Sequence, residues 1–379
     1  MLKLTILRDK LNESIQIVSK AVSSRSAIPI LSGIKIDAGP NGVTLTASDT
    51  EISIRCMIPL ENETERIATV EKTGSAVLPA RFFAEMVKKL PQEEVHIESS
   101  ENLQTVIRSG QTEIQLAGMD PEEFPALPSI IEEQVFSISG IVLKDMIRQT
   151  IFAVSTNEAT PVLTGVLWNL RQGELKFVAT DRHRLASCAA PANGDVEFSN
   201  VVISGRTLSE LAKIIPDQDT LVDIVVSDSQ VLFKLDNVLF LTRMLEGTYP
   251  DTSKIIPQAF KTELVLSAQQ LADAIDRAHL LSREEKTNIV RLTAMEGGDI
   301  EISSSSSELG RVKEQLSASR FSGEPLRIAF NSRYMLDALK VLDSEEIFVG
   351  FTGAMSPIIL RPSDHDRSLH LILPYRTTN

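Results

Sequence analysis

Asp181 and His183 are the pair of residues in this 379-residue chain whose types and spacing first suggest chemistry. A carboxylate near an imidazole can work as an acid–base pair or as two ligands of a metal ion. No third ligand stands close by in the sequence, and a tight cluster of Asp, Glu and His is missing. The other four histidines fall in unrelated stretches, at His96, His279, His365 and His370. A metal-assisted hydrolase or nuclease that uses Asp181 and His183 is therefore an alternative and not the main hypothesis.

Signatures of other enzymes are missing from the sequence. There is no P-loop, no GxGxxG, no HExxH and no GxSxG motif. Two cysteines, Cys56 and Cys188, are too few for a disulfide framework or a Cys-rich zinc module. A run of five serines, residues 303–307, is more typical of a polar strand end or loop than of a nucleophile. We therefore predict no metal, no cofactor and no catalytic residue.

The segments that must position these residues recur along the chain. At an offset of 132, four segments of the first third match the second: residues 21–24, 28–33, 47–49 and Cys56 match 153–156, 160–165, 179–181 and Cys188. At an offset of 125, residues 77–91 and 116–125 match 202–216 and 241–250. The change of offset predicts a longer loop in the first copy, near residues 61–72. Because Cys56 and Cys188 match each other, we predict that both are buried small apolar residues.

A third, weaker copy completes the chain, since Arg206, Glu210 and Lys213 match Arg333, Asp337 and Lys340 at an offset of 127. A period of about 126 residues is far longer than that of solenoid repeats. We therefore predict three domains of one fold, residues 1–127, 128–254 and 255–379. Proline-bearing stretches, residues 120–128 and 246–257, lie at the two junctions, as is typical of linkers.

Each copy shows the same order of elements. Apolar residues at helical spacing predict a first helix, as at Leu11, Ile15 and Val18. Short alternating strands follow, such as residues 33–37, 43–47 and 52–57. A second helix is predicted in each copy, at residues 79–90, 205–215 and 331–342, before the last strands. Two helices packed on antiparallel strands indicate an α+β fold.

Charge separates these predicted helices from the remainder. The chain has 38 basic and 51 acidic residues and a net charge of −13. The six predicted helices together carry about +7, which leaves about −20 for the strands and loops. A basic helical face on an acidic body favours a polyanion partner held at that face alone. A solvated helix face would show the same Lys and Arg bias, and aromatic residues, at 5%, are too few for a stacking platform.

Hydropathy argues against a membrane protein. The first nine residues alternate polar and apolar types, unlike a signal peptide, and no apolar run approaches ~20 residues. We expect a cytoplasmic protein.

Four motifs carry a resemblance to a known family. They are residues 24–31 (Ser-Arg-Ser-Ala-Ile-Pro-Ile-Leu), 180–185 (Thr-Asp-Arg-His-Arg-Leu), 247–251 (Gly-Thr-Tyr-Pro-Asp) and 371–376 (Leu-Ile-Leu-Pro-Tyr-Arg). Together with the three repeats, they resemble the bacterial sliding clamps, the beta subunits of DNA polymerase III. The resemblance implies three copies of the DNA-clamp fold and a non-catalytic processivity factor, a homodimeric ring around duplex DNA. Twelve helices at ~9–10 Å spacing would leave a hole of about 25–28 Å, which admits a duplex.

The resemblance and the charge pattern together suggest the DNA-contacting residues. By resemblance, Arg25 and Asn157 lie in loops near the DNA and Arg206 lies at a helix start. The charge pattern adds nine candidates on the predicted helices: Lys10, Lys20, Arg81, Lys88, Arg148, Lys213, Arg277, Arg333 and Lys340. Contacts of these cations with phosphates would read no sequence.

The resemblance also implies a hydrophobic cleft between the second and third domains. It would take short peptides of the replicative polymerase, the clamp loader, translesion polymerases, mismatch-repair proteins and ligase. The matching positions are Leu163, Thr180, His183, Arg184, Leu185, Pro250, Asn331, Tyr334, Met355, Pro357, Leu371, Ile372, Leu373, Pro374, Tyr375 and Arg376. Leucines, prolines and Met355 would form an apolar trough, with Thr180, His183, Arg184 and Arg376 as polar anchors. Met355 would be an adaptable wall of it. An edge strand alone would also explain residues 371–373.

Four further residues are implied at the dimer interface. Ile114 and Leu116 of one subunit would meet Leu280 and Leu281 of the other in a head-to-tail contact. Their types fit a buried core equally well.

Overall fold

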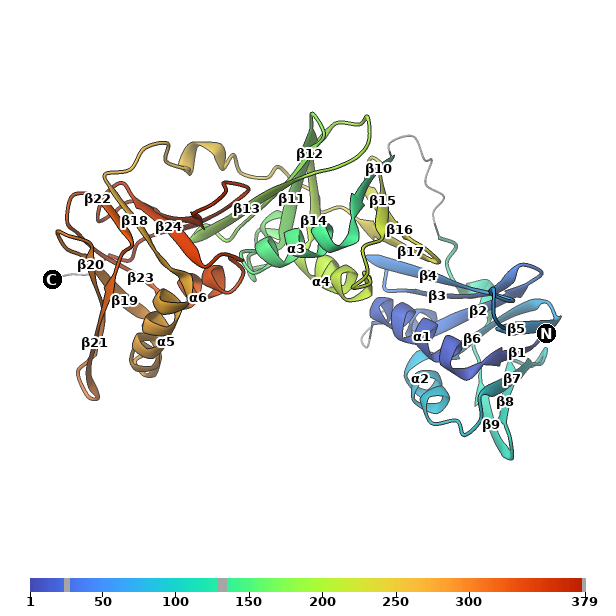
Figure 1. The fold of residues 1–379 in the computed structure, drawn as a ribbon. Helices are drawn as coiled ribbons and strands as arrows, with labels where there is room; N and C mark the ends of the chain where they lie inside the picture. Colours follow the sequence, from blue (N-terminus) through green and yellow to red (C-terminus); the bar gives the residue numbers. More distant parts are fainter. Residues whose placement is uncertain (24–27, 128–134, 377–379) are drawn as a thin grey trace. The chain divides into compact units, whose positions relative to one another are not determined.

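The structure, a computed structural model, describes residues 1–23, 28–127 and 135–376 (Figure 1). Its contacts divide the chain into two compact units, Met1–Gly140 with Glu210–Met244 and Ile141–Ser209 with Leu245–Asn379. Each unit holds two antiparallel sheets with helices packed on them. Within the described residues, no helix combines the length and the apolar character needed to cross a membrane.

The first unit contains a five-stranded sheet and an eight-stranded sheet. In spatial order, the five strands are β5 (Ala68–Lys72), β1 (Leu2–Leu7), β7 (Glu94–Ser99), β8 (Gln104–Ser109) and β9 (Thr112–Ala117). The eight strands are β10 (Val135–Ser139), β15 (Leu221–Val226), β16 (Gln230–Leu235), β17 (Val238–Arg243), β4 (Ile52–Pro59), β3 (Gly42–Ser48), β2 (Gly33–Gly39) and β6 (Gly74–Pro79). The pairing of β17 with β4 joins strands of the first and second repeats into one sheet.

The second unit contains a nine-stranded sheet and a four-stranded sheet. The nine strands are β14 (Phe198–Ser204), β11 (Gly165–Arg171), β12 (Glu174–Thr180), β13 (Arg184–Pro191), β26 (Ser368–Ile372), β25 (Ile358–Pro362), β24 (Glu346–Phe351), β18 (Thr262–Ser267) and β22 (Arg320–Gly323). The four strands are β21 (Gly310–Ser317), β20 (Asp299–Ser306), β19 (Ile289–Ala294) and β23 (Leu326–Asn331). Here β13 pairs with β26, which joins the second and third repeats as β17 and β4 join the first and second.

Within the described residues, six α-helices form where helical spacing predicts them. They are α1 (Arg8–Val18), α2 (Ala80–Lys88), α3 (Gly140–Ile151), α4 (Gly205–Ile214), α5 (Ala268–Glu284) and α6 (Ser332–Leu339). The predicted apolar stripes are buried, as at Leu11, Ile15 and Val18 of α1. Helix α1 packs against α2, and α5 packs against α6. Short 3₁₀ turns complete the described part: η1 (Ser19–Ala21), η2 (Pro29–Ser32), η3 (Pro121–Glu123), η4 (Pro161–Thr164) and η5 (Ser253–Ile255).

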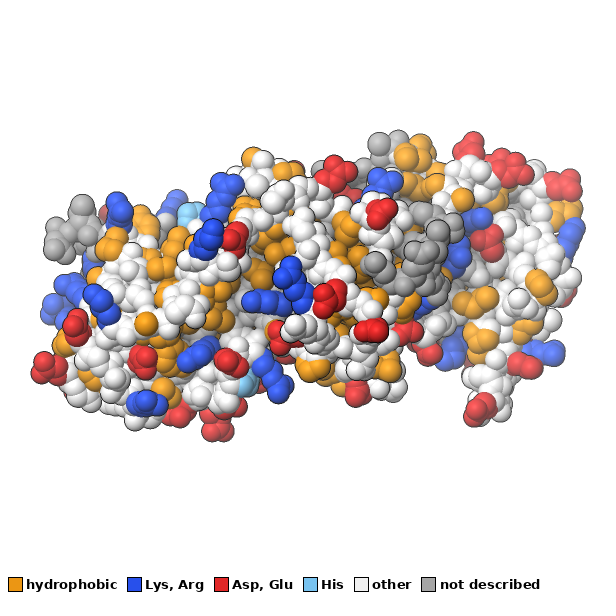
Figure 2. All heavy atoms as spheres, turned by 90° about the horizontal axis from the view of Figure 1, so that it is seen from above, with side chains coloured by type: hydrophobic (Ala, Val, Ile, Leu, Met, Phe, Trp, Pro, Cys, Tyr) orange, Lys and Arg blue, Asp and Glu red, His pale blue; other side chains and the backbone are white. Residues whose placement is uncertain are grey.

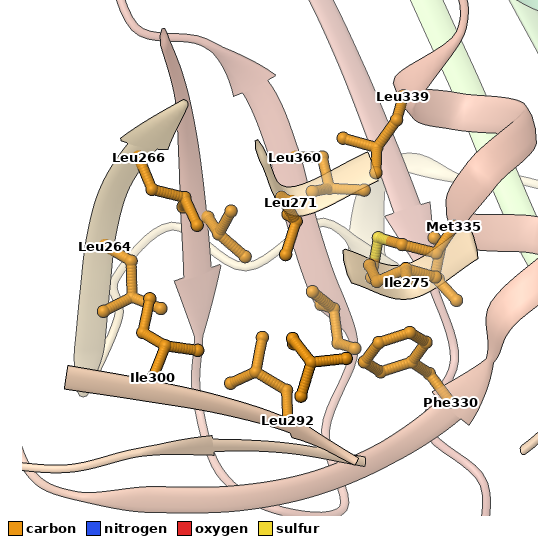
Figure 3. Close-up of a cluster of buried hydrophobic side chains, with 14 of the residues drawn as sticks. Leu264, Leu266, Leu271, Ile275, Leu292, Ile300, Phe330, Met335, Leu339 and Leu360 are labelled. Atoms are coloured by element: carbon orange, nitrogen blue, oxygen red, sulfur yellow. The ribbon is translucent and has the colours of Figure 1, made fainter. Parts of the chain in front are cut away.

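The core of the third repeat shows how these layers hold together (Figure 3). Leu271 and Ile275 of α5 and Met335 and Leu339 of α6 are buried among strands of both sheets. Side chains such as Leu264, Leu360, Leu292 and Phe330 meet them from β18, β25, β19 and β23. Each fully buried leucine of this kind contributes about 1.5–3 kcal/mol relative to an exposed one. The helix pair is thereby fixed against the sheets, and its polar face is left to solvent.

Two local expectations have clear outcomes. The longer segment of the first copy forms β5, which pairs with β1, where the sequence predicted only a loop. Cys56 on β4 lies opposite Val238 of β17, and Cys188 on β13 lies opposite Ser368 of β26. Both cysteines are buried, and burial raises the pKa of both thiols. Their predicted role as small buried residues is confirmed, at equivalent joints between repeats.

Candidate functional site

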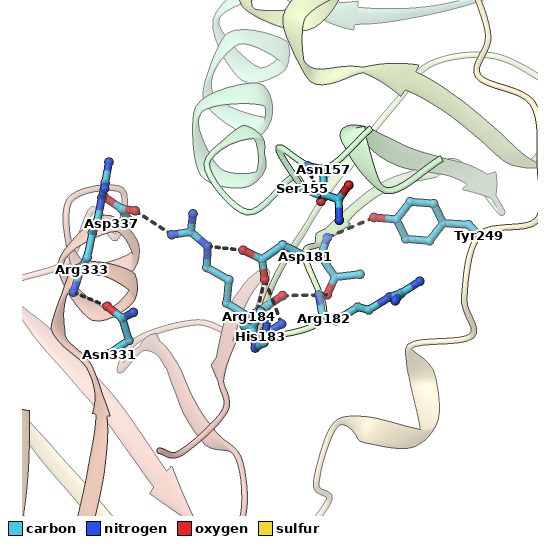
Figure 4. Close-up of polar contacts among 11 residues, drawn as sticks. Ser155, Asn157, Asp181, Arg182, His183, Arg184, Tyr249, Asn331, Arg333 and Asp337 are labelled. Carbon is cyan, nitrogen blue, oxygen red and sulfur yellow. Dashed lines mark hydrogen bonds and ion pairs between the residues drawn. The ribbon is translucent and has the colours of Figure 1, made fainter. Parts of the chain in front are cut away.

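The turn between β12 and β13 is fixed by side chains of its own residues (Figure 4). Thr180 Oγ1 donates to the Arg184 carbonyl at 2.7 Å and accepts from the Arg182 amide at 3.1 Å. Asp181 Oδ1 accepts from the amides of His183 at 2.9 Å and Arg184 at 3.0 Å. Because this carboxylate closes the turn, it is not available to the His183 ring, which instead stacks against Tyr334. This geometry opposes an Asp181–His183 acid–base pair.

Arg184 links the turn to helix α6. Its Nε donates to Asp181 Oδ2 at 3.2 Å, and its Nη1 donates to Asp337 Oδ2 at 2.6 Å. Its guanidinium carbon lies 4.5 Å from the Tyr334 ring centroid and 5.3 Å from that of Phe152. The side chain is only 12% exposed. Two carboxylates and two rings thus surround this cation, and removing one partner of such a buried pair costs about 3–5 kcal/mol.

Tyr249 fixes the other side of the turn. Its hydroxyl accepts from the Thr180 amide at 3.0 Å and donates to the Gly165 carbonyl at 3.5 Å. Burial raises the pKa of this phenol. The ring packs in a cluster with buried leucines, among them Leu163 and Leu371. The turn is therefore anchored both to α6 and to the segment that follows β17.

Two hollows flank this turn in the second unit. The first, of about 460 Å³, is lined by Val154, Ser155, Thr156, Asn157, Thr160, Leu163, Asp181, Arg182, His183, Arg184, Arg333, Tyr334 and Asp337. The second, of about 490 Å³, lies over one face of the nine-stranded sheet and is lined by Leu167, Asn169, Arg171, Glu174, Lys176, Val178, Leu185, Ser187, Tyr249, Pro250, Asp251, Thr252, Ser253 and Ile256. We call the two together the turn cleft. Leu163 lines the first hollow and also packs with Val178, Leu185 and Tyr249 of the second.

Several of the residues predicted for a peptide cleft meet here. Leu163, His183, Arg184 and Tyr334 line the first hollow. Leu185 and Pro250 line the second, and Leu371 packs in the same buried cluster as Leu163. The Leu373 amide donates to the His183 carbonyl at 2.9 Å, which ties the C-terminal segment to the turn.

Other predicted cleft residues do not line the two hollows. Met355 and Pro357 belong to the segment between β24 and β25, and neither lines the turn cleft. Asn331 caps α6, with its side chain accepting from the Arg333 amide. Ile372 is buried in the core of the third repeat. Tyr375 is half exposed and its amide donates to the Ala329 carbonyl, Pro374 is half-buried and Arg376 is exposed.

Two residues expected as polar anchors already have hydrogen-bond partners within the chain. Thr180 is 5% exposed and both of its hydroxyl bonds serve the turn. Arg184 is already held by two carboxylates. The reason is local, since a tight turn and a buried guanidinium each satisfy their own polar groups first.

The sequence left Phe152 and Asp337 out of the predicted site. The repeat pattern did single out Asp337, because it matches Glu210. Nothing in the sequence indicates that Asp337 pairs with Arg184, which lies 153 positions earlier in the chain. Phe152 looked like one more apolar residue near the end of the predicted helix. Neither residue has a motif that would single it out.

The predicted DNA-contacting residues divide by their partners. Lys10 pairs with Glu13 at 3.8 Å, Arg148 with Asp145 at 2.5 Å, and Lys213 with Glu210 at 2.8 Å. Arg277 pairs with Glu314 of β21. Five cations have no carboxylate within 4.0 Å among the described residues, namely Lys20, Arg81, Lys88, Arg333 and Lys340. Arg206 is exposed at the start of α4, Asn157 is exposed in a loop, and Arg25 lies outside the described residues.

The surface that Figure 2 draws carries both signs of charge. Basic and acidic side chains alternate there with apolar ones. Among the described residues, no group of three or more His, Cys, Asp or Glu side chains is placed to hold a metal ion.

The four residues predicted at a dimer interface are not core residues. Leu280 is 52% exposed, and Ile114, Leu116 and Leu281 are half-buried. Ile114 and Leu116 lie on β9, the outermost strand of the five-stranded sheet. Strand β21 is likewise outermost in the four-stranded sheet.

Comparison with known proteins gives one family over the whole chain. Three family models match in succession: the N-terminal domain of the DNA polymerase III beta subunit at residues 2–128, its central domain at 137–251 and its C-terminal domain at 253–376. The chain is 51% identical over 377 residues to the beta sliding clamp of Bacillus subtilis, covering 99% of this chain and all of that protein.

Solved structures agree. A crystal structure of the DNA polymerase sliding clamp from Bacillus subtilis matches with a TM-score of 0.97 at 51% identity, over all of both chains. The DNA polymerase III beta chain of Streptococcus pneumoniae matches with a TM-score of 0.95 at 36% identity, again over all of both chains. With three domains of the clamp fold and relatives of this similarity along its full length, the chain belongs to the family of DNA polymerase III beta subunits.

Proposed function

We propose that two copies of this chain close into a ring around duplex DNA, slide along it, and hold partner proteins at the turn cleft. The chain is a sliding clamp of the replication machinery and not an enzyme. The observation that carries this function is its similarity to beta sliding clamps over the full length of the chain. The hydrolase alternative fails, since the relatives are non-catalytic processivity subunits and Asp181 is committed to its turn and to Arg184.

Retention on DNA by ring closure is consistent with the charge of the chain. A net charge of −13 opposes tight electrostatic binding to a polyanion. A closed ring needs no strong attraction, so weak phosphate contacts suffice. Unpaired cations such as Arg81 and Lys88 of α2 and Arg333 of α6 are suited to such contacts.

Ring closure would join β9 of one copy to β21 of the other. Both are outermost strands whose residues alternate between half-buried and exposed over most of their length. Outermost strands present unpaired backbone groups that can extend a sheet across an interface. Ile114 and Leu116 of β9 would then meet Leu280 and Leu281 at the end of α5.

The turn cleft is our candidate site for partner peptides. Apolar residues of both hollows, such as Leu163, Leu185 and Tyr334, would take apolar peptide side chains. The partners we propose are the replicative polymerase, the clamp loader, translesion polymerases, mismatch-repair proteins and ligase. The protein would work in the cytoplasm, at the nucleoid.

The test is retention on DNA that depends on topology. The protein is loaded with a bacterial clamp loader and ATP onto nicked circular duplex and passed over a sizing column in high salt. The same complex is then cut once with a restriction enzyme and passed again. We expect the protein to stay on circles and to leave linear DNA. Equal loss from both forms would contradict the ring.

A further inference from the structure

One residue in the turn of the cleft has a backbone conformation that its type disfavours. Arg182 has a φ of +75°, in the left-handed region where glycine is the unstrained residue. The bonds from Thr180 and Asp181 described above force position 182 into this conformation. Residues strained in this way are over-represented at binding sites, so this side chain is a candidate for a binding role. Glycine would fit this backbone without strain, so any function at position 182 belongs to the arginine side chain.

The guanidinium of Arg182 is an open cation. It is exposed, and its Nη2 donates to Thr160 Oγ1 at 3.3 Å. In the described part of the chain, no carboxylate lies within ion-pair distance of it. The two carboxylates that line the same hollow, Asp181 and Asp337, are both bound by Arg184. The hollow therefore has a positive charge at its rim and no free anion to neutralise it.

Arg182 is also close in the chain to a residue that is bonded to the second hollow. Arg182 lines the first hollow. Thr180, two residues earlier in the chain, donates its backbone amide to the hydroxyl of Tyr249, which lines the second hollow. Figure 4 shows its side chain pointing away from Arg333 and Asp337, on the side of the turn where Tyr249 lies. A peptide bound in the first hollow would therefore lie within reach of this side chain.

We propose that Arg182 is a specificity-determining residue of the turn cleft, which selects peptides with an Asp or Glu beside their apolar residues. The peptide carboxylate would accept charge-assisted hydrogen bonds from the guanidinium, which are about twice as strong as neutral ones. This inference rests on the peptide cleft proposed above. It adds the charge that the peptide must carry.

The experiment compares the full-length wild type with Arg182→Gly. A display library of random nonapeptides is selected on each protein, and enriched peptides are synthesised with a fluorescent label for anisotropy titration. On the wild type we expect Asp or Glu to be enriched at one position among apolar residues. Replacing that Asp by Asn should weaken binding to the wild type about ten-fold and to Arg182→Gly less than two-fold.

Because glycine is the substitute, a changed peptide preference of Arg182→Gly cannot be attributed to misfolding. Glycine relieves the strain at position 182, so the thermal midpoint of Arg182→Gly should not fall. Lys286→Gly is the matched control, because Lys286 is also an exposed cation with a positive φ, of 58°, and does not line the turn cleft. Its peptide preference should equal that of the wild type.

The outcomes separate this inference from the proposed function. If neither protein enriches any peptide, the peptide cleft itself is wrong. If the wild type enriches apolar peptides without an acid, or Arg182→Gly keeps the same acidic preference, Arg182 is not the selector. Loss of retention on circular DNA by Arg182→Gly, with its peptide preference unchanged, would assign the cation to phosphate instead and overturn the proposal.

Discussion

His370 is a titratable residue buried without any polar partner. It lies on β26 and is 1% exposed, and within the described structure neither ring nitrogen has a hydrogen-bond partner. Its ring packs against Phe152, the same side chain that contacts the Arg184 guanidinium. Burial lowers the pKa of His370 to about 3. The folded protein therefore requires this imidazole to be neutral.

The sign of the resulting pH dependence follows from linkage. An unfolded histidine has a pKa of about 6.5, so between pH 6.5 and pH 3 the unfolded chain binds a proton that the folded chain does not. Stability that is present above pH 6.5 is lost as the pH falls, by about 1.4 kcal/mol per unit. We measure the free energy of unfolding in urea at pH 7 and at pH 5. Between these two pH values, we expect this free energy to fall by about 2 kcal/mol less in His370→Leu than in the wild type. His365→Gln, which removes an exposed histidine, should keep the wild-type difference, and an equal difference for His370→Leu would contradict the buried neutral state.

At the scale of elements, comparison of the repeats explains why the second repeat has apolar side chains on the sheet face at the second hollow and the first repeat does not. Leu167, Val178 and Leu185 line the second hollow of the turn cleft. At an offset of 132, the first repeat has Lys35, Thr46 and Ser53 instead. It also has Phe124 where the second has Tyr249, and so lacks the hydroxyl that holds the turn. The fold is duplicated, but the apolar surface is not.

The interface assignment is tested at the same scale. Leu280→Ala with Leu281→Ala removes two apolar side chains at the end of α5. A loss of about 2 kcal/mol for each would weaken each of the two joints of the proposed ring roughly a thousand-fold, and dimerisation would lose this at both joints. Analytical ultracentrifugation at micromolar concentration should then find monomers. The control is Leu221→Ala, which shortens a leucine that is 62% exposed on β15 and should leave the dimer intact. If the double variant still forms dimers, Leu280 and Leu281 do not belong to the interface.

The sequence predicted the elements better than their connections. Helical spacing predicted the second helix of each copy to within a few residues, at residues 79–90, 205–215 and 331–342 against α2, α4 and α6. The joint between β13 and β26 was not predictable, because strand alternation does not encode which distant strand is the partner. For the cleft, the resemblance proposed Leu163, His183 and Tyr334, and all three line the first hollow. It could not predict that the Arg184 guanidinium forms an ion pair with Asp337. Such pairs depend on tertiary packing.

At the scale of the whole molecule, sliding requires contacts that are weak and replaceable. Arg81 and Lys88 are exposed on α2 and have no carboxylate partner in the described structure. Replacing both with serine should reduce the salt dependence of binding to a short linear duplex, by about 0.9 in log–log slope for each phosphate that is no longer neutralised. Retention on closed circles should not change, because it depends on the ring.

A double substitution away from the helices is the control. Arg243→Ser with Lys261→Ser also removes two exposed cations and should leave the slope as it is. If Arg81→Ser with Lys88→Ser releases the protein from circles, electrostatic attraction and not closure would hold it there.

In the proposed ring, the outermost strands β9 and β21 would meet at each joint, and this has a consequence for the moment when the ring opens. A joint made from two different edges is hidden only while both copies are engaged, so opening one joint bares two strands at once. Bare strands of this kind are templates for unwanted pairing with other chains. By this proposal, an opened ring would expose two sheet edges to aggregation. We therefore expect a factor that opens the proposed ring to cover those edges while they are apart.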